Sequence, residues 1–376
     1  MAHEAPTFTV GIEEEYLVVD RETRDLVSDP PPEFMGSLEG ILGGQVSPEF
    51  LRAQIEIGTK VCSSISEARV DLIRLRQEVN NAASAYGYAI IAASTHPFAR
   101  WQDQKTTDKD RYNELERDMQ AVLRRLVISG MHVHVGIEDE EVRIDLMNQV
   151  KYFVPHLYAL STSSPFWGGE LTGLKSYRKS VFKALPRTGL PPDFSSWGEY
   201  ERHVNVLVEP GVIEDATRLW WDIRPSARYP TLELRVADIC TDLEDGLTIA
   251  ALYQSLLAML YRRRTHNQRW RQYTSMLIEE NIWRAQRYGI SEPLMDFGVG
   301  ALVPFLDLIE ELIELLSEEA EELGCLAEIQ HARTIAVRGT SADHQLQVYR
   351  DALSDGAPKD EALRLVVDYL VEGTSA

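Results

Sequence analysis

Glutamate and histidine side chains recur at two-residue spacing on several predicted strands of this sequence. Residues 7–20 are rich in β-branched and aromatic types, contain no proline and carry three consecutive glutamates. Because successive side chains of a strand point to opposite faces, Glu13 and Glu15 share one face and Glu14 lies on the other. Two carboxylates on a largely apolar strand repel each other and lose hydration, so a positive group is expected between them. This stretch alone is compatible with a divalent cation and with an arginine.

Three further predicted strands place apolar residues on one face and polar residues on the other. The polar residues are Glu56 in 51–61, His132 and His134 in 130–137, and Glu233 with Arg235 in 231–238. If these strands pair in one sheet, their polar side chains cover one of its faces, while helices pack on the other. Oxygen-dominated ligation favours Mg²⁺ or Mn²⁺, and the histidines shift this preference slightly toward Mn²⁺ or Zn²⁺.

Each of these residues also has an ordinary structural explanation. A His-x-His pair can face solvent, Glu56 can be a surface residue, and Glu233 and Arg235 can form structural ion pairs. The combination is stronger than any member, because an ordinary explanation must account for all the strands at once.

Glycine-rich phosphate-binding motifs are missing from the sequence. Neither GxxxxGK[ST] nor a GxGxxG between a strand and a helix occurs, and there is no GxSxG nucleophile elbow. A nucleotide would therefore have to be held through metals and arginines, whose guanidinium forks match phosphate oxygens. The candidates are Arg178, Arg224 and Arg235, with Tyr177 beside the first. Tyr177 and Arg178 could equally cap a loop.

Periodicity and turn residues predict the elements that position these side chains. Helices are expected over 67–86, 110–126 and 139–160, with a kink at Pro155, and strands over 88–93 and 220–224. The short turn before 231–238 favours an antiparallel pair with 220–224. Residues 161–194 are irregular and form a candidate lid. Strands in the first two thirds, followed by an almost wholly helical stretch from 243, predict an α+β fold with an antiparallel sheet.

Size and charge limit the class of protein. The chain has 376 residues, enough for a sizeable core, and a formal net charge of −21. This acidity argues against nucleic acid or an anionic membrane as the main partner. Three scattered cysteines, no signal-peptide pattern and no long apolar run favour a protein of the reducing cytoplasm.

An ordered set of motifs spans about residues 7 to 350. The motifs are GIEEEYLVVD, GMHVHVGI, SYRKSVFKALPRTG, WWDIRPSARYPTLELRVAD, NIWRAQRYG and ARTIAVRGTSADHQLQVY. Together they resemble the carboxylate-amine ligases of the glutamate–cysteine ligase type 2 family. The resemblance implies a single catalytic domain over 1–376 with a mostly helical third at about 243–376. It also implies a curved antiparallel sheet with helices on one face, as in glutamine synthetase and guanidino kinases.

The resemblance further implies an ATP-dependent ligase that forms an amide through an acyl phosphate. Glutamate or a similar carboxylate would be the acyl donor, and an amine such as cysteine the acceptor. The implied metal ligands, for Mg²⁺ or Mn²⁺, are Glu13, Glu15, Glu56, His132 and Glu233, with His134 as a less certain member. Arg235 and Glu233 are the implied catalytic residues, Arg235 stabilising charge on the transferred phosphoryl group. A homodimer is among the expected assemblies.

Two other functions remain open from the residues themselves. A metal-dependent hydrolase could use Zn²⁺ held by His132, His134 and a glutamate, and it would consume no nucleotide. A non-catalytic binding module would instead balance its carboxylates with arginines. The physiological amine, the number of metals and the general base also stay open.

Overall fold

Strand β1 (Val10–Asp20) lies in the middle of an antiparallel sheet. The computed structural model describes residues 5–110, 112, 117 and 119–375, in which seven strands form this sheet. Their order is β10-β11-β5-β1-β3-β2, and β4 pairs with the end of β1. The other six are β2 (Val46–Pro48), β3 (Gln54–Gly58), β4 (Tyr88–Ile91), β5 (Met131–Gly136), β10 (Ile223–Pro225) and β11 (Thr231–Leu234).

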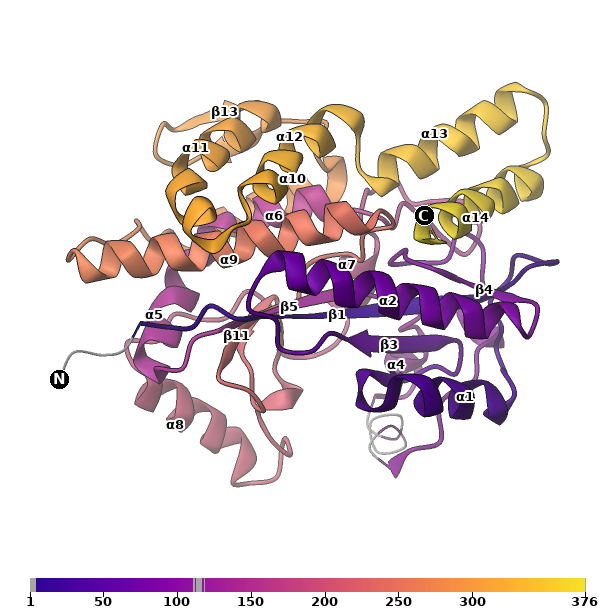
Figure 1. The fold of residues 1–376 in the computed structure, drawn as a ribbon, viewed down its shortest axis with the longest axis horizontal. Helices are drawn as coiled ribbons and strands as arrows, with labels where there is room; N and C mark the ends of the chain where they lie inside the picture. Colours follow the sequence, from indigo (N-terminus) through magenta and orange to yellow (C-terminus); the bar gives the residue numbers. More distant parts are fainter. Residues whose placement is uncertain (1–4, 111, 113–116, 118, 376) are drawn as a thin grey trace.

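Two long helices, α2 (Ile65–Ser84) and α9 (Leu243–Thr265), cover one face of the sheet (Figure 1). Ile12, Tyr16 and Val18 of β1 point into the core beneath these helices. Glu13 and Glu15 point to the opposite face, which becomes apolar only farther along the strand. This alternation, which the sequence predicts, places the polar residues on the face that the two long helices leave uncovered.

The remaining elements surround this framework. The helices are α1 (Pro32–Leu42), α4 (Ala121–Arg124), α5 (Glu140–Val150), α6 (Val154–Ser161), α7 (Arg178–Phe182), α8 (Trp197–Val208), α10 (Ser275–Tyr288), α11 (Phe305–Leu323), α12 (Leu326–Arg338), α13 (Ser341–Ser354) and α14 (Lys359–Ser375). Short 3₁₀ turns are η1 (Gly43–Gln45), η2 (Trp101–Asp103), η3 (Lys151–Phe153) and η4 (Ala216–Arg218). Short strands pair as β6 (Phe166–Trp167) with β7 (Glu170–Leu171), β8 (Thr188–Gly189) with β9 (Trp220–Trp221), and β12 (Leu294–Asp296) with β13 (Ala301–Val303).

The predicted α+β fold with an antiparallel sheet and packed helices is confirmed. The single strand predicted over 220–224 is wrong, because the chain divides there into β9 and β10. Asp222, between the two, has a buried carboxylate that pairs with Lys179 at 2.6 Å, and its carbonyl accepts the Arg235 N–H at 2.8 Å. This buried ion pair turns the chain out of β9 and into the pairing with β11.

One helix prediction also needs correction. The helix expected over 139–160 is broken at η3, and Pro155 lies in the first turn of α6, where its missing N–H costs no hydrogen bond. The helix expected over 110–126 lies partly outside the described residues; within it, the described residues 110, 112, 117 and 119 and those of α4 are helical, with a turn at Gln120.

The segment 161–194, predicted as a lid, is anchored in the core at two places. Ser163 and Ser164 are fully buried, and Asp238 accepts hydrogen bonds from the Ser163 N–H, the Ser164 hydroxyl and the Ser176 hydroxyl at 2.7–2.9 Å. Lys179 is held by Asp222, as described above. These contacts fix the segment at residues 163–164, 176 and 179, and the lid stays a prediction for the residues between and beyond them.

Among the described residues, no helix combines the length and apolar character that crossing a bilayer requires.

Candidate functional site

The register of the sheet brings the predicted polar residues together on one face. Glu13 lies opposite His132 across β1 and β5, and His134 lies opposite Glu233 across β5 and β11. On the other edge of β1, Glu15 lies opposite Glu56 of β3. Directly opposed residues of antiparallel strands have Cβ atoms about 5 Å apart, so their side chains meet. Four adjacent strands therefore build one continuous polar surface.

Three overlapping groups on this surface have the donor atoms of a metal site. They are Glu13 with His134 and Glu233, Glu13 with Glu56 and His132, and Glu15 with Glu49 and Glu56. Within each group, one donor atom from every residue lies within 4.8 Å of the others. Glu13 and Glu56 are each shared by two groups, so the three groups form a row across the sheet.

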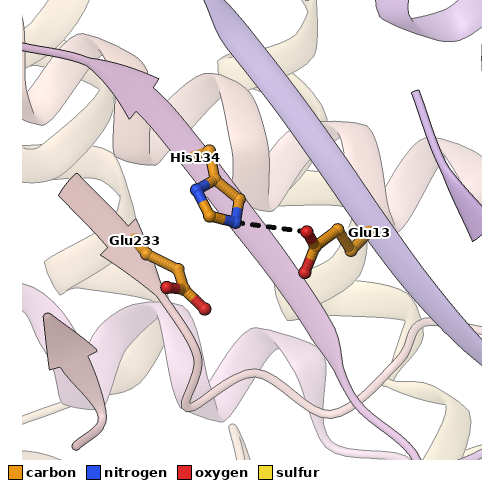
Figure 2. Close-up of side chains that lie close together, drawn as sticks. All are labelled: Glu13, His134 and Glu233. Atoms are coloured by element: carbon orange, nitrogen blue, oxygen red, sulfur yellow. Dashed lines mark ion pairs between the residues drawn. The ribbon is translucent and has the colours of Figure 1, made fainter. Parts of the chain in front are cut away.

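Glu13 faces His134 (Figure 2) and also contacts His132, the other histidine of β5. His132 Nδ1 lies 3.1 Å from Glu13 Oε2, and it must donate because a carboxylate can only accept. Burial raises the pKa of Glu13, but the contacts with His132 and His134 and their charges outweigh this effect and lower the pKa well below its usual value. Glu13 is thus held as an anion.

His134 occupies the centre of the group drawn in Figure 2, between Glu13 and Glu233. Its Nδ1 shares a hydrogen bond of 2.9 Å with the Thr231 hydroxyl, which fixes the orientation of the ring. Its buried Nε2 lies 3.5 Å from Glu13 Oε1 and makes no hydrogen bond at that geometry. A buried ring nitrogen with a fixed orientation and no hydrogen bond is suited to accept a metal ion.

Glu56 lies among like charges. Burial is the largest cause that raises its pKa well above the usual value, followed by the charges of Glu49, Glu13 and Glu15. The Ser47 hydroxyl donates to Glu56 at 3.1 Å, which offsets only part of this. Within the described part of the chain, no lysine or arginine forms a salt bridge with Glu13, Glu15 or Glu56. Such a concentration of unneutralised carboxylates is what a divalent cation stabilises.

Glu49 is a member of this surface that the sequence reasoning missed. It follows β2, the three-residue strand that pairs with β3 and places Ser47 opposite Glu56. The sequence feature that could have placed Glu49 on this surface is the stretch Val46–Pro48 directly before it. Three residues are too few for periodicity to distinguish a strand from a loop.

Glu233 lies between two arginines. Arg224 donates to both its oxygens, at 2.8 and 3.3 Å, and Arg235 donates to it through Nη1. Burial raises the pKa of Glu233, and the charges of Arg235 and Arg224 more than reverse this, so the group stays ionised. The two arginines differ, since Arg224 also donates to the carbonyls of Thr217 and Leu219, whereas the buried Nε of Arg235 has no hydrogen-bond partner.

The predicted phosphate contacts Tyr177 and Arg178 lie where α7 begins, and the Arg178 guanidinium lies beside Gly130. Arg178 is 5% exposed and donates at 3.2 Å to the carbonyls of Val236 and Arg235. Its guanidinium lies against Gly130, where a Cβ atom would come within 2.3 Å of Nη2. The ring of Tyr177 packs against Trp167 at 5.4 Å. Two donors of Arg178 thus bind the backbone at Arg235 and Val236, its buried Nε has no hydrogen-bond partner, and its contact with phosphate stays a prediction.

Gly130 lies between the Arg178 guanidinium and the Glu15 carboxylate and contacts both. Its N–H donates to Glu15 at 2.7 Å, immediately before β5 begins. The absence of a side chain lets Arg178 approach one side of the backbone while the N–H orients Glu15 on the other.

Comparison with known proteins identifies relatives over nearly the whole chain. A sequence model of the family described as glutamate-cysteine ligase family 2 matches residues 9–368. A protein of Rhodospirillum rubrum, named as a candidate glutamate–cysteine ligase 2, is 61% identical over 375 residues, which is 99% of this chain and 96% of that protein.

Two solved structures share the fold at low sequence identity. The glutamate–cysteine ligase of Francisella tularensis, in complex with AMP, has a TM-score of 0.67 and 14% identity, covering 98% of this chain and 89% of that one. A bifunctional glutathione synthetase of Pasteurella multocida has a TM-score of 0.68 and 15% identity, covering 97% of this chain and 52% of that one. At these identities the likeness establishes the fold.

Proposed function

This chain belongs to glutamate-cysteine ligase family 2, and we propose that it joins glutamate, or a similar carboxylate, to an amine through an acyl phosphate. Its membership makes it an ATP-dependent ligase that forms carbon–nitrogen bonds. Cysteine, the acceptor in the relatives' name, is the first amine to consider. The three cysteines of the chain are free and buried, in keeping with action in the cytoplasm.

The observation that carries the proposal is the row of carboxylates and imidazoles across four strands. Its oxygen-rich donor set fits Mg²⁺ or Mn²⁺, and a bound cation would offset the burial and the like charges that raise the pKa of Glu56. Glu13, Glu15, Glu49, Glu56, His132, His134 and Glu233 are the residues that would hold such ions. When bound, divalent cations offset the repulsion between the anionic carboxylate substrate and the phosphates of ATP.

The protein's own residues would prepare the first chemical step. In that step a substrate carboxylate oxygen forms a bond to the γ-phosphorus of ATP, and the bond to the β–γ bridging oxygen breaks to release ADP. Arg235, held beside Glu233 with its Nε unused, would donate to the phosphoryl oxygens as charge develops there. Arg224 would keep Glu233 oriented while Arg235 shifts its hydrogen bonds toward the substrate.

In the second step the amine nitrogen bonds to the acyl carbon, phosphate leaves, and the ammonium proton passes to a base. The acyl phosphate is readily hydrolysed, so the site has to exclude water. The side chains of His132 and His134 are only 4% and 8% exposed, and this burial favours the exclusion of water near β5.

The test is a coupled measurement of ADP, phosphate and amide with ATP, Mg²⁺, glutamate and a panel of amines headed by cysteine. We expect the three products in equal amounts with at least one amine. The hydrolase alternative uses the same histidines with Zn²⁺ and needs no nucleotide, so cleavage of an amide at full rate in nucleotide-free buffer would overturn the proposal.

A further inference from the structure

A cavity of about 380 Å³ lies behind α9, away from the polar face of the sheet. It is lined by η3 and α6, by residues 269–273, by the β12–β13 hairpin and by α11. Helix α9 contacts α6 and α11 on one side and β1 and β5 on the other, so it separates this cavity from the sheet (Figure 1). Its volume falls in the range of small-molecule sites, roughly 300–1,000 Å³.

Aromatic rings form much of the cavity wall, with Tyr152 at their centre. Its ring centroid lies 5.8 Å from that of Trp270, 5.5 Å from that of Tyr273 and 5.0 Å from that of Phe153. Such a wall binds flat rings by stacking and binds cations at the faces of the rings.

Two carboxylates share this wall without a cationic partner. In the described chain neither Asp296 nor Glu311 forms a salt bridge with a lysine or arginine, although both line the cavity. Burial and then the charges of Asp296, Tyr273 and Glu311 raise the pKa of Tyr152, so the acids act on the aromatic wall directly. The cavity therefore places two carboxylates that have no salt-bridge partner against an aromatic surface.

The remaining polar groups of the wall fit a ligand that carries hydrogen-bond donors. His156 is 5% exposed, its Nδ1 has no hydrogen bond, and burial lowers its pKa to about 4, so the ring is neutral. Arg269 and Arg271 also line the cavity, but both side chains are exposed at its edge. Arg269 pairs with Asp145 at 2.9 Å, and the Arg271 guanidinium carbon lies 5.2 Å from the centroid of the Tyr273 ring.

We propose that this cavity binds a small primary amine with a flat aromatic body. The ammonium group pairs with Asp296 and Glu311, and the ring stacks within the wall that Tyr152, Trp270 and Tyr273 form. The site is separate from the ligase site, and its ligand binds whether or not ATP is present. This inference does not depend on the proposed reaction, because it concerns binding behind α9.

Calorimetric titration with benzylamine, benzyl alcohol and benzoate tests the charge preference. We expect benzylamine to bind at least about tenfold more tightly than the other two, with an affinity that saturating ATP and Mg²⁺ change by less than about twofold. Equal binding of benzoate, no binding of benzylamine at millimolar concentration, or displacement by ATP would overturn the proposal.

Two variants locate the binding. Asp296→Asn keeps the oxygen that accepts the Gly298 and Val299 N–H groups at 2.6 and 3.0 Å, and Glu311→Gln alters an exposed side chain, so both should fold. Each should weaken benzylamine binding about tenfold, whereas Glu314→Gln, an exposed position on the same helix that does not line the cavity, should not change it. Unchanged affinity in both cavity variants would place the amine elsewhere and refute the inference.

Discussion

Replacing Arg235 by lysine should slow phosphoryl transfer strongly and leave the fold nearly as stable. The lysine keeps the positive charge beside Glu233 but loses the planar fork and the unused Nε. Glu233 would still accept two hydrogen bonds from Arg224, so no buried carboxylate is left unpaired. The change thus removes the proposed contact with the phosphoryl group while sparing the framework.

The expected magnitude follows from these contacts. Losing one preorganised donor to developing charge costs about 10²–10³ in turnover, or roughly 3–4 kcal/mol of the barrier. The cost in stability should be about 1 kcal/mol, because a single charge-assisted hydrogen bond is exchanged for a weaker one.

The neighbouring arginine provides a matched control. Arg224→Lys makes the same chemical change on the same carboxylate, but it also removes hydrogen bonds to the Thr217 and Leu219 carbonyls. It should therefore lower the free energy of unfolding more than Arg235→Lys does, by about 2–4 kcal/mol, and slow catalysis less. Single-turnover ADP formation and urea unfolding on the same preparations measure both quantities.

The reverse ranking would refute this reasoning. Normal ADP formation by Arg235→Lys, together with a large loss of stability, would make Arg235 a structural partner of Glu233. The phosphoryl contact would then have to be sought elsewhere.

Three further predictions concern buried ionisable side chains. Glu56→Gln should raise the thermal midpoint in EDTA, because it removes repulsion from Glu49, Glu13 and Glu15, yet abolish the stabilisation by Mg²⁺; a midpoint that falls in EDTA contradicts this. Burial lowers the pKa of His96 from 6.5 to about 4, so its contribution is complete above pH 6.5 and is lost toward pH 4. Between these pH values the free energy of unfolding of the wild type should fall by about 3 kcal/mol because of His96. Urea titrations of the wild type and of His96→Gln across this pH range measure the difference, and equal pH dependence of the two would exclude this role. Arg76→Met should cost about 3–5 kcal/mol by leaving the Glu14 carboxylate buried and unpaired, and adding Glu14→Gln should recover part of it; a cost below 1 kcal/mol in urea unfolding would contradict the assignment.

The face on which each strand residue lies could be predicted from the sequence, because side-chain direction alternates locally. This reasoning separated Glu13 and Glu15 from Glu14 and paired His132 with His134, as the structure has them. Which residues meet across strands depends on the register, which long-range pairing sets. The contact between His134 and Glu233 therefore could not be derived from either segment alone.

The same dependence on long-range packing explains why the surroundings of Glu14, Arg178 and Arg224 could not be predicted from the sequence. The sequence is compatible with an arginine beside the glutamates of β1, and the structure has one on the helix side, where Arg76 of α2 donates to both Glu14 oxygens at 2.6 and 2.9 Å. Arg178 and Arg224 have the residue type that binds phosphate, and most of their donors are engaged by backbone carbonyls and Glu233, while the buried Nε of Arg178 has no hydrogen-bond partner. Residue type predicts what a side chain can bind, whereas tertiary packing decides whether its donors remain available.

The dependence of ATP binding on a divalent cation tests the central claim most directly. No glycine-rich motif or other phosphate cradle is evident in the sequence, while Glu13, Glu15 and Glu56 concentrate negative charge where the phosphates would approach. Calorimetric titration with ATP in EDTA and then in excess Mg²⁺ should therefore give binding only with the metal. Glu56→Gln should weaken that metal-dependent binding, while Glu314→Gln on the far side of α9 should leave it unchanged. Tight binding of ATP in EDTA would contradict the account, because the carboxylates of this face would then have no cation to hold between themselves and the nucleotide.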